Sequence, residues 1–131
     1  MLDTNMASAA LAGHHAADAR LRDLPNSAWA ISSIVRAELR FGIARKPEAV
    51  RLARLVEAFL QVAPTEAFDA AAADAYGRVR AQLEKEGKGI GVANELIAAH
   101  ALALGAVVVT HNRRHFDRVA GLQVEDWLEL E

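Results

Sequence analysis

Residues 106–110 constrain the fold of this chain more than any other segment. The run Ala-Val-Val-Val-Thr is apolar and rich in β-branched residues, and such continuous runs are typical of strands in parallel sheets that are covered on both faces. Other short apolar segments alternate along the chain with segments whose apolar residues recur at spacings of three and four, as in amphipathic helices. Strands that alternate with helices predict an α/β fold built on a parallel sheet.

Length and composition limit the classes of protein to be considered. The 131 residues predict a single domain, 1–131, large enough to bury about two-thirds of its unfolded surface. Apolar residues make up 53% of the chain, which argues against disorder, and no stretch approaches the roughly 20 apolar residues of a membrane span. Cysteine is absent, which excludes thiolate metal sites and a cysteine nucleophile and fits a cytoplasmic location.

The charge of the chain restricts how it could meet nucleic acid. A formal net charge of −2 argues against a protein that coats nucleic acid through bulk positive charge. It permits an enzyme that meets nucleic acid through a local basic rim around an acidic centre. The arginines that could form this rim, or could equally be solvated helix faces, are Arg36, Arg40, Arg45, Arg113, Arg114 and Arg118.

The predicted elements follow one another as short strands and helices. Besides a strand that ends at Asp3, strands are expected at 29–32, 61–64, 106–110 and 122–125. Helices are expected at 15–23, from Ser33 as N-cap to near Gly42, from Pro47 through Leu60, from Asp69 as N-cap to about Glu86, and from Asn94 as N-cap to Leu104. Residues 111–118 should form a polar loop or short helix, and Trp127 should pack back onto the body.

Polar side chains recur at the starts of loops and helices that follow the apolar segments. Asp3 follows the first strand, Glu38 lies one turn into the helix after the second, Asn94 begins a buried helix, and Asn112 follows the strongest strand. Parallel strands place their carboxyl ends on one edge of a sheet, so we expect Asp3, Glu38 and Asn112 to come together there. Oxygen ligands without cysteine suit a hard cation, Mg²⁺ or Mn²⁺.

Each of these residues also has a simpler interpretation. Asp3 is suited to an Asx turn or a helix N-cap, Asn94 and Asn112 are good cap residues, and Glu38 could be a solvated helix charge. His100, on a buried helix, is interpreted as a hydrogen-bonded core histidine rather than as a metal ligand. Residue types alone therefore do not decide between caps and a site.

Four ordered blocks of sequence bear a resemblance that does favour a site. They are Met-Leu-Asp-Thr-Asn at 1–5, Ile-Ser-Ser-Ile-Val-Arg-Ala-Glu-Leu-Arg-Phe-Gly at 31–42, residues 91–101 with Leu-Ile-Ala-Ala-His-Ala, and Val-Thr-His-Asn at 109–112 followed by Phe116 and by Glu-Asp-Trp at 125–127. Over essentially its whole length the chain resembles the PIN-domain ribonucleases, and among them the VapC-type toxins of bacterial toxin–antitoxin (VapBC) pairs. The resemblance implies a three-layer α/β/α fold with a central, mostly parallel sheet of four to five short strands.

The resemblance also implies an activity and a set of site residues. The family's first acid falls on Asp3, its second on Glu38, its third on Asn94, and its fourth position, often Asn in this toxin branch, on Asn112. It implies an Mg²⁺-dependent endoribonuclease, with Mn²⁺ as a substitute, in which Asp3 and a carboxylate at position 94 hold the metal and Glu38 orients or deprotonates a water. In this scheme Asn5 and Thr110 hold ligands or waters in place.

Position 94 departs from the family pattern, because Asn stands where an Asp is expected. Glu95 is adjacent, but one helical step is a rotation of about 100°, so Glu95 should not take over the missing carboxylate. We therefore expect weakened or absent cleavage with the fold preserved.

The resemblance implies partners as well: a VapB-type antitoxin, a second copy in a homodimer, an RNA substrate, and operator DNA only through the antitoxin, without a membrane. A catalytically silent PIN-fold protein that acts through antitoxin and operator DNA is the main alternative. A haloacid-dehalogenase-like phosphatase would need a second Asp at the position of Asn5 and a Lys before the last acid, and the sequence offers neither.

Overall fold

The computed structural model describes residues 1–128, and its centre is a parallel sheet. The named strands are β1 (Ile31–Ser32), β2 (Thr65–Glu66), β3 (Val108–Val109) and β4 (Val124–Glu125). Leu2 bridges β1 and β3 in parallel, so the strands lie in the order β2, β1, Leu2, β3, β4. The predicted α/β fold with a mostly parallel sheet of four to five short strands is confirmed.

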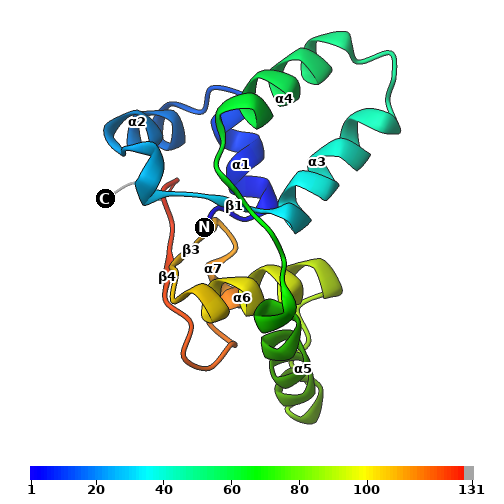
Figure 1. Cartoon of the computed structure of the whole chain (residues 1–131), viewed down its shortest axis with the longest axis vertical. Coiled ribbons are helices and arrows are strands. Elements are labelled where there is room, and N and C mark those ends of the chain that lie inside the picture. Colours follow the sequence, from blue (N-terminus) through cyan, green and yellow to red (C-terminus); the bar gives the residue numbers. More distant parts are fainter. Residues whose placement is uncertain (129–131) are drawn as a thin grey trace.

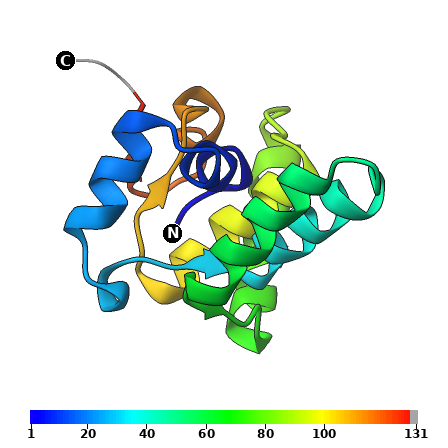
Figure 2. The same ribbon diagram turned by 90° about the horizontal axis from the view of Figure 1, so that it is seen from above.

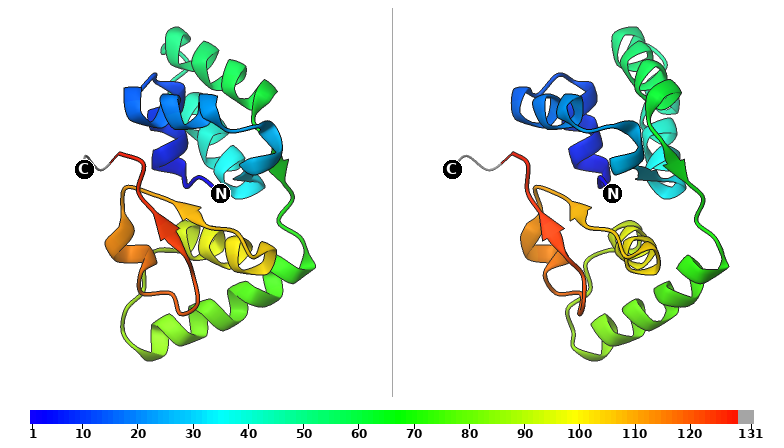
Figure 3. Two further views of the ribbon diagram at one scale, coloured as in Figure 1. Left: turned by 90° about the vertical axis from the view of Figure 1, so that its left-hand side faces the viewer. Right: turned by 60° about the vertical axis from the view of Figure 1, so that its left-hand side comes forward.

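Helices cover both faces of this sheet. They are α1 (Thr4–Leu11), α2 (His15–Asp23), α3 (Ser33–Ala44), α4 (Val50–Val62), α5 (Ala70–Lys85), α6 (Val92–Leu104) and α7 (Arg113–Phe116), with a short 3-10 helix, η1, at Asn26–Ala28. α1 to α4 gather on one side, whereas α6 lies on the other side with α5 beneath it (Figures 1 and 3). From above, α3 and α4 lie side by side, and α1 stands between them and α2 (Figure 2).

The N-terminal strand holds the two halves of the sheet together. The backbone N–H of Leu2 donates to Ala30 at 3.1 Å, and that of Asp3 donates to Val109 at 3.0 Å. Leu2 is fully buried, as are Ile31 and Val108 on neighbouring strands. Because each strand is only about two residues long, side-chain packing in this core contributes most of what keeps the strands in register.

The predicted strands and helices exist, but several of their boundaries were wrong. Ser32, not Ser33, caps α3 by accepting from the N–H of Ile34 at 3.0 Å, and the helix continues through Gly42. A glycine inside a helix costs only about 1 kcal/mol relative to alanine, which tertiary packing offsets. Residues before α4 form a turn that contains Pro47, and the helix begins at Val50.

The strand predicted at 61–64 was also misplaced. α4 continues to Val62, and Ala63 then takes an extended conformation, as the residue before a proline tends to do. The carbonyl of Pro64 accepts from Ile31 at 2.9 Å, so pairing starts there and the strand proper is Thr65–Glu66. Pro64 therefore marks the start of this strand rather than its end.

Other predictions were correct in detail. The helix at 15–23 has the predicted bounds, and Asp69 caps α5 by accepting from Ala72 at 3.0 Å. Trp127 is buried against the body, and His100 is a core histidine whose Nδ1 lies 2.8 Å from the Ser32 hydroxyl. Within residues 1–128, no helix combines the length and the apolar character that crossing a membrane requires.

Candidate active site

Asp3 combines the two roles that its sequence position allowed. It leaves the sheet at the carboxyl end of the N-terminal strand and caps α1, with Oδ1 accepting from the N–H of Met6 at 2.9 Å. Its Oδ2 accepts from the Thr110 hydroxyl at 2.5 Å, so both oxygens are held from opposite sides. The side chain is therefore fixed in orientation.

The electrostatic surroundings of Asp3 disfavour its charged form. Burial raises the pKa of Asp3 most, and the nearby carboxylates of Glu38 and Asp126 raise it further. The hydrogen bonds from Thr110 and Met6 lower it, but the net pKa stays above the usual value for aspartate. A cation at this position would offset both the burial and the repulsion.

Glu38 reaches the same place from α3. It is half-buried, and the Thr4 hydroxyl at the start of α1 donates to its Oε1. Asp3, Thr4, Asn5 and Glu38 line one side of a cavity of about 330 Å³, and residues 91–94 line the other. Glu38 is thus a cavity residue and not a solvated helix charge.

Asn94 lies in this cavity wall but does not cap α6. The N-cap is Gly91, whose φ of +96° is a conformation that glycine adopts readily. The Asn94 amide donates instead to the Ile90 carbonyl at 3.1 Å, which leaves its Oδ1 as the atom available to the cavity. The prediction of a capping role for Asn94 was wrong, because the helix starts two residues before it.

Glu95 does not replace the missing carboxylate, as its helical position predicted. It is buried, and its Oε2 accepts from the N–H of Ile90 at 3.2 Å. It is not among the residues that line the cavity. Glu95 therefore stabilises the loop before α6.

Asn112 is connected to Asp3 only indirectly, through hydrogen bonds of the Thr110 hydroxyl. Its backbone N–H donates to the Thr110 hydroxyl at 2.8 Å, and its side-chain amide lies 2.5 Å from His115 Nδ1. It does not line the cavity, whereas Asn5 does. The structure thus brings together Asp3, Asn5, Glu38 and Asn94, and Asn112 acts on them through Thr110.

Asp126 is a residue near the site to which the sequence reasoning gave no role. Its charge raises the pKa of Asp3, and its side chain, 6% exposed, pairs with His111 at 2.9 Å and accepts from Leu128 at 2.8 Å. It follows β4 directly, just as Asp3 and Asn112 follow their strands. The rule about the carboxyl ends of strands would therefore have found it.

The structure shows which arginines of the predicted basic rim lie on the same side as Glu38 or beside the cavity wall. Arg36 and Arg40 each lie two residues from Glu38, a rotation of about 200°, so they lie on the opposite side of α3, and Arg40 pairs with Glu57 of α4. Arg118 reaches the carbonyl of Gly89 at 3.3 Å, beside the loop that leads into the cavity wall. Arg45, the C-cap residue of α3, lies seven residues from Glu38 and therefore on the same side of the helix axis.

The donor atoms at the cavity fit a hard cation only in part. Asp3 and Glu38 supply carboxylates and Asn94 supplies an amide oxygen, which are ligands of the type that Mg²⁺ and Mn²⁺ accept together with several waters. Among residues 1–128, no group of three His, Cys, Asp or Glu side chains is placed to hold a metal ion. An Asp at position 94 would supply the third carboxylate.

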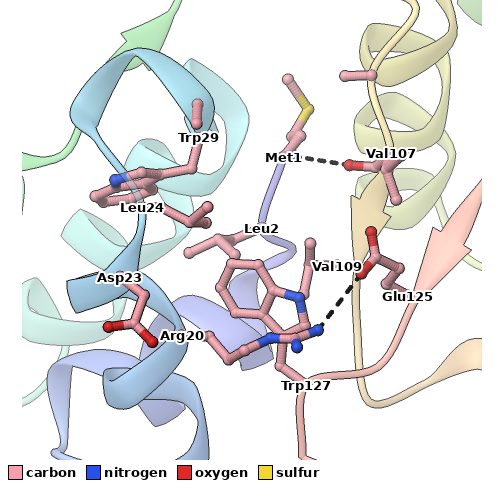
Figure 4. A pocket seen from close by; sticks show the side chains of 12 residues that line it. Met1, Leu2, Arg20, Asp23, Leu24, Trp29, Val107, Val109, Glu125 and Trp127 are labelled. Atoms are coloured by element: carbon pink, nitrogen blue, oxygen red, sulfur yellow. Dashed lines mark hydrogen bonds and ion pairs between the residues drawn. The ribbon is translucent and has the colours of Figure 1, made fainter.

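A larger cavity, of about 520 Å³, lies between α2 and strands β3 and β4 (Figure 4). It shares Leu2 and Val109 with the core but contains none of the predicted site residues. Arg20 lies over the Trp127 ring at 5.5 Å and pairs with Glu125 at 3.5 Å, so these two charges of the larger cavity are matched, and Asp23, which also lines it, is exposed to water. The smaller cavity is therefore the candidate active site, despite its size.

Comparisons with known proteins show the family to which the chain belongs. The PIN domain family model matches residues 1–122. The tRNA(fMet)-specific endonuclease VapC of Shigella flexneri is 35% identical over 127 residues, which cover 97% of this chain and 96% of that protein. Ribonuclease VapC2 of Rickettsia felis is 36% identical over 131 residues, with 97% and 96% covered.

Solved structures give the same result. The DNA-bound VapBC structure from Salmonella typhimurium contains a chain that matches with a TM-score of 0.89 at 35% identity, covering 97% of this chain and 96% of that one. The chain therefore belongs to the PIN-domain family and, within it, to the VapC ribonucleases. The resemblance read from the sequence is confirmed, and by family the protein is a nuclease.

Proposed function

We propose that this protein is the toxin of a VapBC-type pair and that its small cavity holds Mg²⁺, or Mn²⁺, for the endonucleolytic cleavage of RNA. The observation that carries the proposal is that Asp3, Glu38 and Asn94, from three distant segments, line one cavity. Like-charged groups gathered in a partly buried place are costly unless a cation joins them. The location we propose is the cytoplasm, in keeping with a chain that has no cysteine.

In the proposed cleavage of RNA, Asp3 and Glu38 have different roles. A bound divalent ion would lower the pKa of a water and offset charge on the phosphate. Asp3 would be its principal protein ligand, because Thr110 and the Met6 N–H already fix both of its oxygens. Glu38, held by Thr4, would orient the attacking water or accept its proton.

Asn94 should weaken this site. Its neutral amide oxygen replaces a charged one, and a single charge–charge contact near a surface cleft is worth about 4 kcal/mol before desolvation. A net loss of about 1–3 kcal/mol corresponds to roughly five- to 150-fold in metal affinity. The loss in turnover should be larger, because metal placement also sets the geometry of the water.

The test compares the protein with its Asn94→Asp variant. Calorimetry should show tighter Mg²⁺ and Mn²⁺ binding by the variant, and total RNA should be cleaved faster. Asn26→Asp, the same chemical change at an exposed residue of η1, is the matched control and should alter neither. Equal metal affinity and equal activity in the protein and the Asn94→Asp variant would contradict the assignment of position 94.

We further propose a VapB-type antitoxin and a second copy of the chain as partners, with operator DNA bound only through the antitoxin. The relatives from Rickettsia felis and Salmonella typhimurium were solved as VapBC complexes with DNA. On α4 of this chain, Val50, Leu52 and Val62 expose apolar surface that a protein partner would cover. Co-expression with the neighbouring reading frame should give a stable complex, and light scattering should show a dimer of the toxin alone.

The alternative of a catalytically silent binding protein has one observation in its favour. The Asn94 amide is already hydrogen-bonded to Ile90, so the position is stable without a metal. This alternative predicts that neither the protein nor its Asn94→Asp variant cleaves RNA in excess Mn²⁺. It also predicts that the toxin–antitoxin complex still binds operator DNA.

A further inference from the structure

We propose that Phe41 and Arg45 form a stacking site for one base of a single-stranded RNA, next to the position of the scissile phosphate at Glu38. The inference rests on the proposed function, and it adds where the substrate lies on the surface. It assigns a role in substrate binding to an exposed aromatic side chain that the proposed chemistry does not use.

Helix geometry places these residues on the Glu38 side of α3. Phe41 and Arg45 follow Glu38 by three and seven residues, which are rotations of about 60° and 20° from it at 3.6 residues per turn. At a rise of 1.5 Å per residue they lie about 4.5 and 10.5 Å further along the axis. α3 runs outward from the centre of the molecule toward its turn with α4, so the two residues continue the site away from the sheet (Figure 1).

The Phe41 ring is unusually available for contact. Phe41 is 64% exposed, whereas the core residues of the same helix, Val35 and Leu39, are buried. The Arg45 guanidinium lies 5.6 Å from the ring centroid and covers one face of it. A Cβ added at Gly42, the residue after Phe41, would meet no atom within 4 Å apart from its chain neighbours, so the helix surface at that position is open.

The chemistry of this pair fits a nucleotide. Every base has a π-face that stacks on an aromatic ring whatever its identity, and unstacked bases of single-stranded RNA are recognised in this way. Arg45 adds a positive charge for the neighbouring phosphate without losing its contact with the ring. Among the described residues, Arg45 takes part in no ion pair, in contrast to Arg40, which is paired with Glu57.

The experiment measures RNA binding without cleavage. The unmodified chain, which carries Asn94, is titrated into fluorescein-labelled oligouridine and into an abasic ribose-phosphate oligomer of the same length, with a gel to confirm that the probe stays intact. Phe41→Ala should weaken oligouridine binding roughly five- to hundredfold, as expected for the loss of one base–aromatic stack. It should leave the abasic oligomer unaffected, and Phe41→Trp should retain affinity with a fluorescence change on binding.

Matched controls make the result specific. Leu104→Ala removes another exposed apolar side chain, 48% exposed, at the C-terminal end of α6, and should not affect either probe. Arg45→Gln should weaken binding of both probes, because it removes a charge that meets phosphate.

Each alternative result overturns a defined statement. Unchanged oligouridine binding by Phe41→Ala, with cleavage by Asn94→Asp, would overturn this inference alone. No RNA binding by the unmodified chain would overturn the proposed function together with it. If Phe41→Ala instead turned a dimer into a monomer and weakened both probes equally, this side of α3 would be a contact between copies.

Discussion

The cavity between α2 and strands β3 and β4 differs from the cavity at Asp3 and Glu38 in whether its charged groups are paired. In the larger one, between α2 and strands β3 and β4, Arg20 pairs with Glu125 and stacks on Trp127. In the smaller one, Asp3 and Glu38 lie close enough for one charge to raise the pKa of the other. Among residues 1–128, neither of these two carboxylates takes part in an ion pair.

The difference shows that volume is a poor guide to function in this protein. The larger cavity measures about 520 Å³ and the smaller about 330 Å³, yet the smaller holds a buried carboxylate, that of Asp3, close to a second one, Glu38, whereas Asp23, which lines the larger and has no ion pair among the described residues, is exposed to water. A buried like-charge pair costs free energy of folding unless something else binds there. The smaller cavity therefore indicates a cationic ligand, whereas in the larger one Arg20 has Glu125 as its partner and the Met1 ammonium donates to the Val107 carbonyl.

The largest expected effect comes from deleting Asp3 in an Asn94→Asp background. Asp3→Ala removes the acceptor of both Met6 and Thr110 and the principal metal ligand, so RNA cleavage should fall at least hundredfold. Arg20→Ala in the same background alters the larger cavity and should leave cleavage near its starting level. Quantitative cleavage assays on total RNA check both, and a similar loss from the two changes would break the comparison.

A second prediction concerns metal-dependent stability. Asn94→Asp loses the amide hydrogen bond to Ile90, worth about 0.5–1.5 kcal/mol, and adds a third carboxylate, so without metal it should unfold more easily than the parent. Mg²⁺ at a hundredfold excess over its dissociation constant adds about 2.7 kcal/mol, so the variant's melting temperature should rise by several degrees and more than the parent's. Differential scanning calorimetry with and without Mg²⁺ measures this, and equal rises would place position 94 away from the metal.

The sequence predicted residue positions best where the regular geometry of a strand or helix determines them. The carboxyl ends of parallel strands brought Asp3 and Glu38 together, and the rotation per helical residue correctly kept Glu95 out of the cavity. Sequence reasoning did not predict the hydrogen-bond partner of a side chain that has more than one partner within reach. The side-chain amide of Asn112 contacts His115, and that of Asn94 donates to Ile90. A position at the edge of a sheet does not fix the direction in which an amide points.

The boundaries of the elements show the same limit. Strands of two residues carry almost no periodic signal, so the strand after α4 was placed before Pro64 rather than after it. Ser32 and Ser33 are equally good caps by type, and only the three-dimensional position of the Ile34 N–H decides between them. The rule that points to Asn112 applies equally to Asp126, which also follows a strand directly.

A third prediction uses pH to detect the unbalanced charge. The pKa of Asp3 is raised in the folded protein. At a pH between its unfolded and folded pKa values, the native state therefore binds more protons than the unfolded state does. As pH rises through this range, the free energy of unfolding decreases because of this group. Asp3→Asn keeps the cap on α1 and does not titrate. The unfolding free energy of the variant minus that of the parent should therefore increase from acidic to neutral pH.

Urea unfolding at several pH values measures this difference. Burial lowers the pKa of His100, so His100 makes both proteins less stable as pH falls toward and below its ordinary value of about 6.5. Both carry the same histidine in the same core, so its contribution cancels in the difference. Parallel stability curves for the two proteins would mean that Asp3 is not destabilised by burial and repulsion.

The smallest expected effect tests the balanced charges of the larger cavity. Arg20 and Glu125 have side chains that are 55% and 53% exposed, and ion pairs of this kind contribute about 0.2–1 kcal/mol because water screens them. A double-mutant cycle with Arg20→Met and Glu125→Gln should give a coupling energy in that range, and Arg20→Met keeps the apolar contact with Trp127. Increasing salt should reduce the coupling further. A coupling energy of several kcal/mol would show instead that the charges of the larger cavity are also poorly screened by water. The two cavities would then differ only in that one holds opposite charges and the other like charges.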